Sequence, residues 1–267
     1  MALAHWQEPR TKFLAVATDY DGTLARNGKV QPETLRALSR VRLSGRRVIL
    51  LTGREISSLK QVMPQLEVFD LIVAENGAVL YSPFSRTEAP LAKAPLPEFV
   101  KRLQEEGVQP LSVGTLIIAT LRVHQKTVLR LIRKLDLNLE VSMNRGSMMI
   151  LPSGVDKGTG LEAALGSLAI EFLEVVGIGD AENDIGFLGR CGWSVAVGNA
   201  LPKVKAIVDL VLDSECRCLR LHRSLRMGRT PFVLSRKKRP WSCVCQPVSR
   251  GVLVSLWVRE AKCTLPL

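Results

Sequence analysis

A chain of 267 residues is long enough to bury a large core, so we expect one large domain, or one and a half. Its composition, 46% hydrophobic and 23% charged, is that of a globular protein. No apolar segment approaches the roughly 20 residues that span a bilayer, and Glu8 and Arg10 precede any apolar run. We therefore expect neither a secretory signal nor a membrane partner, and we expect a cytoplasmic protein.

The net charge of +12 would indicate an anionic partner if it were spread evenly. It is not, because residues 1–210 carry +3 and residues 211–267 carry +9. The basic C-terminal part is thus the only feature that favours nucleic acid, and we do not expect the protein to bind it.

The first predicted strand covers residues 13–18 and stops at two aspartates, Asp19 and Asp21. Because side chains alternate along a strand, the two carboxylates leave the same side if the extended geometry persists. Two such charges repel each other unless a cation or a shared proton relieves them. The alternative is a polar turn, since an aspartate followed by Gly22 is common turn chemistry.

Helical spacing over residues 31–41 and 55–63 alternates with apolar runs over 47–51 and 71–74 that predict buried strands. The two strands end in short polar runs, Thr52-Gly53-Arg54 and Glu75-Asn76-Gly77. This β-α-β-α-β order predicts a parallel sheet whose strands all end at one edge, where ligands bind.

Residues 83–152 differ in character and predict a small α/β unit inserted into the larger one, here called the cap. Its expected elements are helices near 98–106 and 126–135 and strands at 116–121, 139–143 and 148–151. We expect the cap to choose the substrate, and its candidate polar contacts are His124, Asn144, Arg145 and Ser147. The predicted domains are a discontinuous core at 1–82 and 153–213, the cap at 83–152, and an atypical basic tail at 214–267.

Lys157 lies where the chain returns to the core, before a predicted helix over 161–168. A strand over 173–179 then ends in an acidic run that contains Asp180, Asn183 and Asp184. Further strands are expected at 194–197 and 208–212.

Four polar groups therefore end at one predicted edge: Asp19 with Asp21, Thr52, Lys157, and Asp180 with Asp184. Each alone has a simple explanation, as a turn, a solvated lysine or a helix N-terminus. Together, carboxylates without thiols or imidazoles suit a hard cation such as Mg²⁺. A hydroxyl, backbone amides and an ammonium group suit a phosphate, so the combination predicts phosphoryl transfer.

Four motifs carry a resemblance to a known family: Asp19-Tyr20-Asp21-Gly22-Thr23-Leu24, Leu51-Thr52-Gly53-Arg54, Gly154-Val155-Asp156-Lys157-Gly158 and Gly179-Asp180-Ala181-Glu182-Asn183-Asp184. The chain resembles the haloacid dehalogenase (HAD) superfamily, in the branch with an inserted α/β (type IIB, Cof-like) cap. Order, spacing and cap position agree from roughly residue 13 to 212. The resemblance implies an α/β fold, with a Rossmann-like parallel-sheet core and an inserted smaller α/β cap domain.

The resemblance also implies a Mg²⁺-dependent phosphatase that hydrolyses a small phosphomonoester, such as a sugar phosphate or similar metabolite, through an aspartyl-phosphate. Asp19 would be the nucleophile, and Asp21 would protonate the leaving oxygen and then take a proton from water. Mg²⁺ would be held by Asp19, the Asp21 carbonyl and Asp180. Asp184 would support it through water or by orienting its ligands.

The phosphoryl oxygens would be held by Thr52 and the Gly53 amide, with Lys157 balancing their charge. Asn183 is a further candidate contact to the phosphate or to Lys157. Arg54 either reaches the substrate or forms a structural ion pair, and the sequence leaves both open.

The sequence excludes three other binding motifs. A dinucleotide fingerprint that begins at Gly177 would need Gly or Ala where Glu182 stands. A calcium loop that begins at Asp180 would need glycine where Ile185 stands. The sequence contains no P-loop motif. Two rivals share part of the chemistry, a phosphosugar mutase and a non-enzymatic phospho-acceptor switch. Asp21 and the cap both favour an enzyme over a switch, because an acid/base beside the nucleophile shortens the life of an aspartyl-phosphate.

The tail has an unusual composition. From Cys216 to Leu267 it holds twelve Lys and Arg against one acid, Glu260, and relatives of this family usually continue with a closing helix instead. Its Cys-x-Cys pairs suggest zinc only weakly, since zinc sites more often have two to four intervening residues. We interpret residues after about 215 as a shifted reading frame or a disordered segment.

Overall fold

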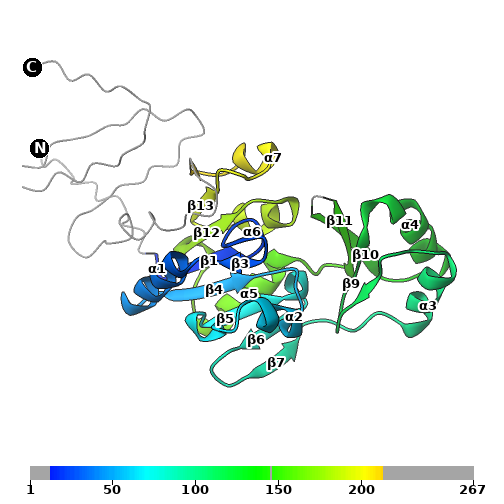
Figure 1. Cartoon of the computed structure of the whole chain (residues 1–267), viewed down its shortest axis with the longest axis horizontal. Coiled ribbons are helices and arrows are strands. Elements are labelled where there is room, and N and C mark those ends of the chain that lie inside the picture. The colour runs from blue at the N-terminus through cyan, green and yellow to red at the C-terminus, as the bar shows by residue number, and fades with distance from the viewer. Residues whose placement is uncertain (1–12, 145, 213–267) are drawn as a thin grey trace, which may run out of the picture. The chain divides into compact units, whose positions relative to one another are not determined.

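The computed structural model describes residues 13–144 and 146–212. Within them lie an eight-stranded sheet, a four-stranded sheet and a two-stranded hairpin (Figure 1). The predicted tail and Arg145 lie outside the described residues.

The large sheet has the strand order β14-β13-β12-β1-β4-β5-β6-β7. Its strands are β1 (Ala15–Asp19), β4 (Arg47–Leu51), β5 (Leu71–Ala74), β6 (Val79–Ser82), β7 (Thr87–Pro90), β12 (Val175–Gly179), β13 (Trp193–Ala196) and β14 (Leu210–Val211). The six strands from β14 to β5 pair in parallel, as predicted from the alternation of helices and strands. β6 and β7 extend the sheet as an antiparallel hairpin, which the sequence pattern does not predict.

Helices cover both faces of this sheet, as α/β crossovers require. They are α1 (Pro32–Leu43), α2 (Ile56–Val62), α5 (Lys157–Leu168), α6 (Ile185–Leu188) and α7 (Pro202–Lys205). Short 3-10 turns connect the elements: η1 (Leu66–Val68), η2 (Glu75–Gly77), η4 (Phe172–Glu174) and η5 (Glu182–Asp184). The hairpin of β2 (Ala25–Arg26) and β3 (Lys29–Val30) follows β1.

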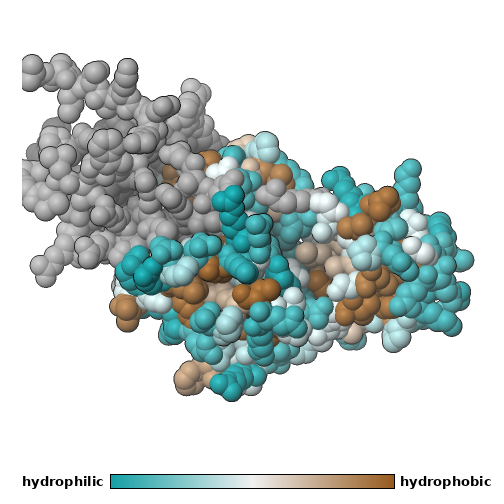
Figure 2. Space-filling model, viewed as in Figure 1, coloured by the Kyte–Doolittle hydropathy of each residue, from teal (hydrophilic) through white to brown (hydrophobic). Residues whose placement is uncertain are grey.

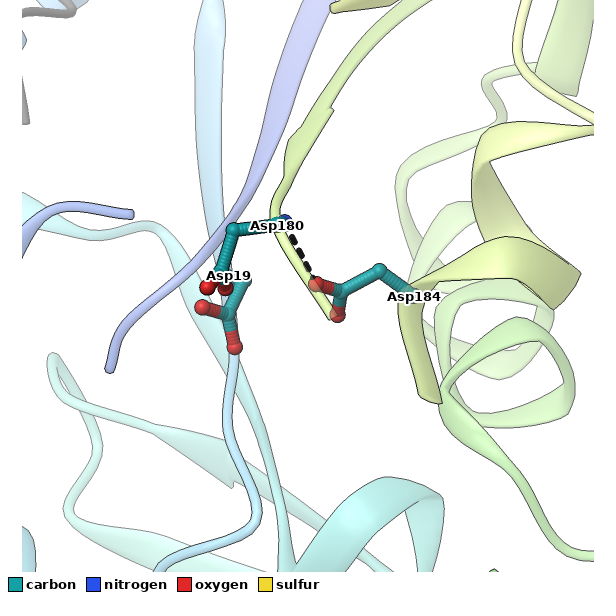
Figure 3. Close-up of side chains that lie close together, drawn as sticks. All are labelled: Asp19, Asp180 and Asp184. Carbon is teal, nitrogen blue, oxygen red and sulfur yellow. Dashed lines mark hydrogen bonds between the residues drawn. The ribbon is translucent and has the colours of Figure 1, made fainter. Parts of the chain in front are cut away.

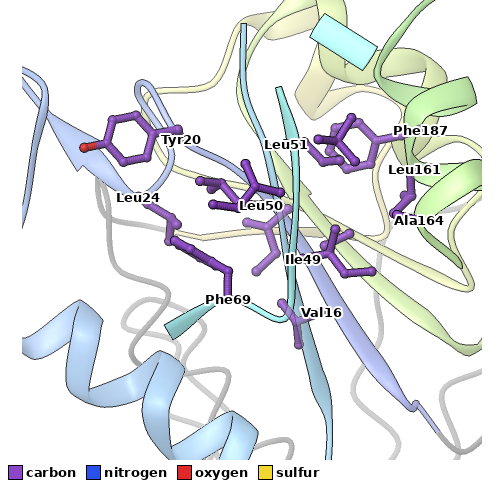
Figure 4. Close-up of a cluster of buried hydrophobic side chains, with 14 of the residues drawn as sticks. Val16, Tyr20, Leu24, Ile49, Leu50, Leu51, Phe69, Leu161, Ala164 and Phe187 are labelled. Carbon is purple, nitrogen blue, oxygen red and sulfur yellow. The ribbon is translucent and has the colours of Figure 1, made fainter. Parts of the chain in front are cut away.

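The core forms because the central strands are apolar on both faces. Val48, Ile49, Leu50 and Leu51 in β4 are all fully buried. Figure 4 shows Leu50 on the side of Tyr20 and Leu51 on the side of Phe187, as the alternation of strand side chains requires.

The cap elements are α3 (Pro97–Glu105), η3 (Arg122–His124), α4 (Gln125–Lys134), β8 (Ser112–Val113), β9 (Ile118–Leu121), β10 (Leu139–Asn144) and β11 (Ser147–Pro152). The strands form an antiparallel sheet with the order β10-β11-β9-β8. Phe99, Leu131 and Ile150 belong to a separate small core beneath α3 and α4, whose outer faces are hydrophilic in Figure 2. The predicted α/β class with an inserted smaller α/β unit is confirmed.

The domain boundaries stay a prediction, although β7, which lies inside the range predicted for the cap, pairs with β6 of the large sheet. None of the helices described is both long and apolar enough to cross a membrane.

Candidate active site

The predicted polar groups meet at the carboxyl edge of the large sheet. β1 lies between β12 and β4. Its last residue is Asp19, and Asp180 and Thr52 come directly after the two neighbouring strands. Neighbouring parallel strands end side by side. Thr52 and Asp180, which lie 33 and 161 residues after Asp19 in the sequence, therefore lie beside it in the structure.

Three of the carboxylates form a tight buried group. Oxygens of Asp19, Asp180 and Asp184 all lie within 4.8 Å of one another, and Figure 3 shows the three side chains converging. The Asp184 carboxylate is held by the backbone amides of Asp180, at 2.8 Å, and Ala181, at 3.0 Å. The Thr23 hydroxyl donates to Asp180 over 3.2 Å.

Lys157 is the cation of this group. Its Nζ lies 2.5 Å from Asp19 Oδ1 and 2.7 Å from Asp184 Oδ1, and its side chain is 1% exposed. It is the first residue of α5, which begins four residues before the predicted helix because Asp156 and Thr159 form a capping box. The cap of this helix therefore sets where the lysine enters the site.

The pKa values of Asp19 and Lys157 are both raised, for different reasons. Burial, together with the nearby Asp184 and Asp180, raises the pKa of Asp19 well above its usual range, although Lys157 opposes this. Burial alone would lower the pKa of Lys157, but the carboxylates of Asp184 and Asp19 outweigh it and raise that pKa. The lysine therefore stays charged, and it pairs with two of the three carboxylates, those of Asp19 and Asp184.

Asp21 has a different partner from Asp19. Arg54 donates from Nε to Asp21 Oδ2 at 2.7 Å and from Nη2 to Oδ1 at 2.8 Å. This bidentate bond is the largest cause that raises the pKa of Arg54. Of the two readings of Arg54, the structure shows the ion pair, and it links the first two motifs.

A tight loop turns Asp21 away from the strand. Gly22 has a φ of +87°, and a Cβ there would lie 2.5 Å from Asp180 Oδ2. The Asn199 side chain donates to the Gly22 carbonyl at 2.8 Å and fixes the loop. Any side chain at position 22 would collide with the carboxylate group, so glycine is required there.

Three of the predicted phosphate-binding residues lie after strand ends: Thr52 and Gly53 follow β4, and Asn183 lies in η5 after β12. The Thr52 side chain is fully buried, and its Oγ1 accepts from the Arg54 amide at 3.1 Å. The Asn183 amide donates to Asn76 Oδ1 at 2.9 Å. Gly53 faces the cap, since a Cβ there would lie 2.5 Å from the end of Met149.

A family model for haloacid dehalogenase-like hydrolases matches residues 16–126 and 116–217, which contain this whole site. The chain belongs to the haloacid dehalogenase-like hydrolases.

Relatives and solved structures agree with this family. The phosphoglycolate phosphatase of Methanothermobacter thermautotrophicus is 30% identical to the chain, and the match covers 75% of this chain and 92% of that protein. The phosphoglycolate phosphatase of Pyrobaculum aerophilum is also 30% identical, and the match covers 76% of this chain and 89% of that protein. A haloacid dehalogenase-like hydrolase from Bacteroides thetaiotaomicron has the same fold, with a TM-score of 0.67, 19% identity, and coverage of 80% of this chain and 98% of that one. A subclass IIB sugar phosphatase does too, with a TM-score of 0.64, 20% identity, and coverage of 79% and 99%. The prediction of a HAD-type phosphoric monoester hydrolase is confirmed.

The acidic group fits the magnesium ion expected for this family. It offers oxygen donors without any thiol or imidazole, and it sets three carboxylates against one ammonium group. Among the described residues, Asp19 Oδ2 is buried and has no hydrogen-bond partner. A buried carboxylate oxygen of this kind is costly unless a cation or a donor meets it. The Asp21 carboxylate is not one of the three in this group, and its carbonyl as a ligand stays a prediction.

The structure brings to the site residues for which the sequence pattern predicts no role. Asn76 is fully buried beside Asn183, and among the described residues Asn76 Nδ2 and Asn183 Oδ1 have no hydrogen-bond partner. Thr23 connects the first motif to Asp180, and Asn199 holds the Gly22 carbonyl of that motif. The signal for Asn76 was present, since it stands in a polar run after a predicted strand.

The predicted cap contacts separate into two groups. Asn144 and Ser147 pair across the β10–β11 hairpin, and β10 contacts the turn η5 that carries Asn183. His124 instead bonds to the Gln109 carbonyl over 2.8 Å within the cap, a structural role.

Proposed function

We propose that the chain hydrolyses a small phosphomonoester in two steps at Asp19. The observation that carries the proposal is the separation of the first two aspartates, with Asp19 buried on Lys157 and Asp21 paired with Arg54 outside the buried group. One carboxylate thus stands where a nucleophile is needed. The other is partly exposed beside Arg54, where it would exchange protons with the leaving group and water.

In the first step, a carboxylate oxygen of Asp19 would attack phosphorus while the bond from phosphorus to the leaving oxygen breaks. Asp21 would give that oxygen its proton. In the second step, Asp21 would take a proton from water as the water attacks the aspartyl-phosphate, which releases inorganic phosphate and restores Asp19.

The phosphoryl oxygens would be held by the Thr52 hydroxyl, the Gly53 amide and Lys157. Asn76 Nδ2, which has no hydrogen-bond partner within the described part of the chain, is a donor at the same edge, and Asn183 positions it through their shared hydrogen bond. Asp19, the Asp21 carbonyl, Asp180 and Asp184 would hold Mg²⁺. The bound ion would neutralise charge between the nucleophile and the phosphoryl group.

The first substrate to test is 2-phosphoglycolate, because the relatives that match at 30% identity are phosphoglycolate phosphatases. Sugar phosphates follow, as the class expected from the resemblance and the activity of a structural neighbour. A phosphorylated metabolite in the cytoplasm is the partner that we propose.

A panel of phosphometabolites, assayed for released phosphate with Mg²⁺ and with chelator, tests the proposal. We expect steady turnover of at least one monoester with Mg²⁺, no bisphosphate activator, and loss of activity in chelator that Mg²⁺ restores. A requirement for a bisphosphate would favour the mutase, and a stable phosphoprotein without turnover would favour the switch.

Replacing Asp21 with asparagine should lower kcat by about 10²–10⁴-fold, the usual contribution of a general acid/base. With p-nitrophenyl phosphate, whose leaving group needs little protonation, the first step should survive better than the second. Rapid-mixing experiments should then show a burst of p-nitrophenol, up to one equivalent per enzyme. Arg54→Lys keeps the positive charge but not the bidentate geometry and should lose less activity. An unchanged kcat in Asp21→Asn would remove Asp21 from the mechanism.

A further inference from the structure

One buried carboxylate near the site has no part in the proposed mechanism. Glu75 begins the turn η2, directly after β5, and is 2% exposed. No Lys or Arg pairs with it anywhere in residues 13–144 and 146–212. A buried charge needs either a counter-charge or several hydrogen bonds, so its partners are informative.

The partners of Glu75 are backbone amides of the cap. Oε1 accepts from the Thr115 amide at 3.1 Å, and Oε2 accepts from the amides of Leu116 at 2.7 Å and Ile117 at 3.1 Å. Three successive N–H groups between β8 and β9 thus converge on one carboxylate of the core. Such charge-assisted bonds are the strong kind.

The rest of the turn touches the residues that form the phosphate site. The backbone N–H of Asn76 donates to the Thr52 carbonyl at 2.9 Å, and the side-chain oxygen of Asn76 accepts from the Asn183 side chain. A Cβ on Gly77 would lie 1.9 Å from the carbonyl of Asp156, the residue before Lys157.

The backbone of the turn is also held in an unusual conformation. Glu75, Asn76 and Gly77 have φ values of 48°, 54° and 114°. Two successive residues with side chains in the left-handed region are unfavourable and persist only where surrounding contacts hold them. Here the contacts are those to the cap and to the second, third and fourth motifs.

We propose that Glu75 is a positioning residue that seats the cap on the phosphoryl site. The segment 115–117 leads into β9, β9 pairs with β11 at Ala119 and Met149, and Met149 lies against Gly53. An anchor at 115–117 therefore sets where the cap sheet meets the phosphate-binding turn. The proposal rests on the proposed phosphatase activity for its kinetic consequence, but the anchor itself can be measured without turnover.

Kinetics of Glu75→Ala give the first test, on the best substrate of the panel and on acetyl phosphate, whose small leaving group offers the cap little contact. We expect KM for the best substrate to rise roughly tenfold or more, the effect of losing hydrogen bonds to a charged group. The kcat/KM for acetyl phosphate should change less than about threefold. Glu75→Gln should be intermediate, because its one carbonyl oxygen can still accept from Leu116 and Ile117. Asp209→Asn is the matched control, since Asp209 also binds a backbone amide, that of Ser194, but far from the cap.

Hydrogen exchange of the full chain gives the second test. The amides of residues 115–117 should exchange faster in Glu75→Ala than in wild type, and those of α3 should not. Unchanged exchange there, or an equal loss of activity on both substrates, would overturn the proposal. If wild type hydrolyses no monoester of the panel, the proposed function fails while the exchange result still decides the anchor.

The contact can also be broken from the cap side. A Cβ on Gly114 would lie 2.9 Å from Glu75 Oε2, its nearest contact, and 3.2 Å from Glu55 Cγ, so Gly114→Ala should raise KM as Glu75→Ala does. In the Glu75→Ala background, Gly114→Ala should raise KM little further, because the carboxylate with which its Cβ would clash is absent. Gly166→Ala, where a Cβ meets nothing within 4 Å, is the control. Additive effects of Gly114→Ala and Glu75→Ala would contradict the proposal.

Discussion

Replacing Asp19 with asparagine is expected to abolish turnover, with a loss on the order of 10⁴-fold or more, as for other enzymes that lose their nucleophile. The amide is nearly the same size as the carboxylate, and its oxygen can still accept from Lys157 at the position of Asp19 Oδ1. A carboxamide is a poor nucleophile compared with a carboxylate, so the first step should not occur.

The fold of this variant should be intact. In chelator at neutral pH it should be at least as stable as wild type, because one of three mutually repelling carboxylates has gone. Phosphate release and urea unfolding measure the two effects separately. Wild-type turnover in Asp19→Asn would refute the mechanism. A large loss of stability would show that repulsion among the three carboxylates does not destabilise the wild-type site.

Replacing Lys157 with methionine should give the largest loss of stability. The change leaves Asp19 and Asp184, which are 6% and 0% exposed, without their cation. Removing one partner of a buried ion pair typically costs about 3–5 kcal/mol. We expect a loss of this size in urea unfolding with chelator present, together with loss of activity.

Magnesium should partly restore the stability of Lys157→Met, and by more than it stabilises wild type, since the uncompensated carboxylates bind a cation more tightly. Lys203→Met is the control, because the Lys203 pair with Glu182 is partly exposed and worth about 0–1 kcal/mol. An unfolding free energy of Lys157→Met within that same range would show that the lysine does not balance the buried charges. If Mg²⁺ stabilised wild type and Lys157→Met equally, the ion would not bind at this group of carboxylates.

Much of the site could be predicted because it follows from local pattern and topology. Apolar runs that stop at Asp19, Thr52 and Asp180 mark strand ends, and the alternation with helices makes those ends neighbours. The hairpin of β6 and β7 was missed, since short strands after a polar turn carry little periodic signal. The start of α5 at Lys157 was missed because its cap depends on side-chain bonds.

What the sequence determined by itself is the family, the α/β class and the set of chemical groups at the sheet edge, because these depend on motif order and on the repeat of strand and helix. Only the tertiary structure decided which group pairs with which. Asp19 and Asp21 are two residues apart, yet one binds Lys157 and the other Arg54. Glu75 finds its amides 40 to 42 residues away, and Asn183 reaches Asn76 across 107 residues. Such bonds leave no periodic trace in the chain, since they exist only after the strands, the turn η2 and the cap have been brought together.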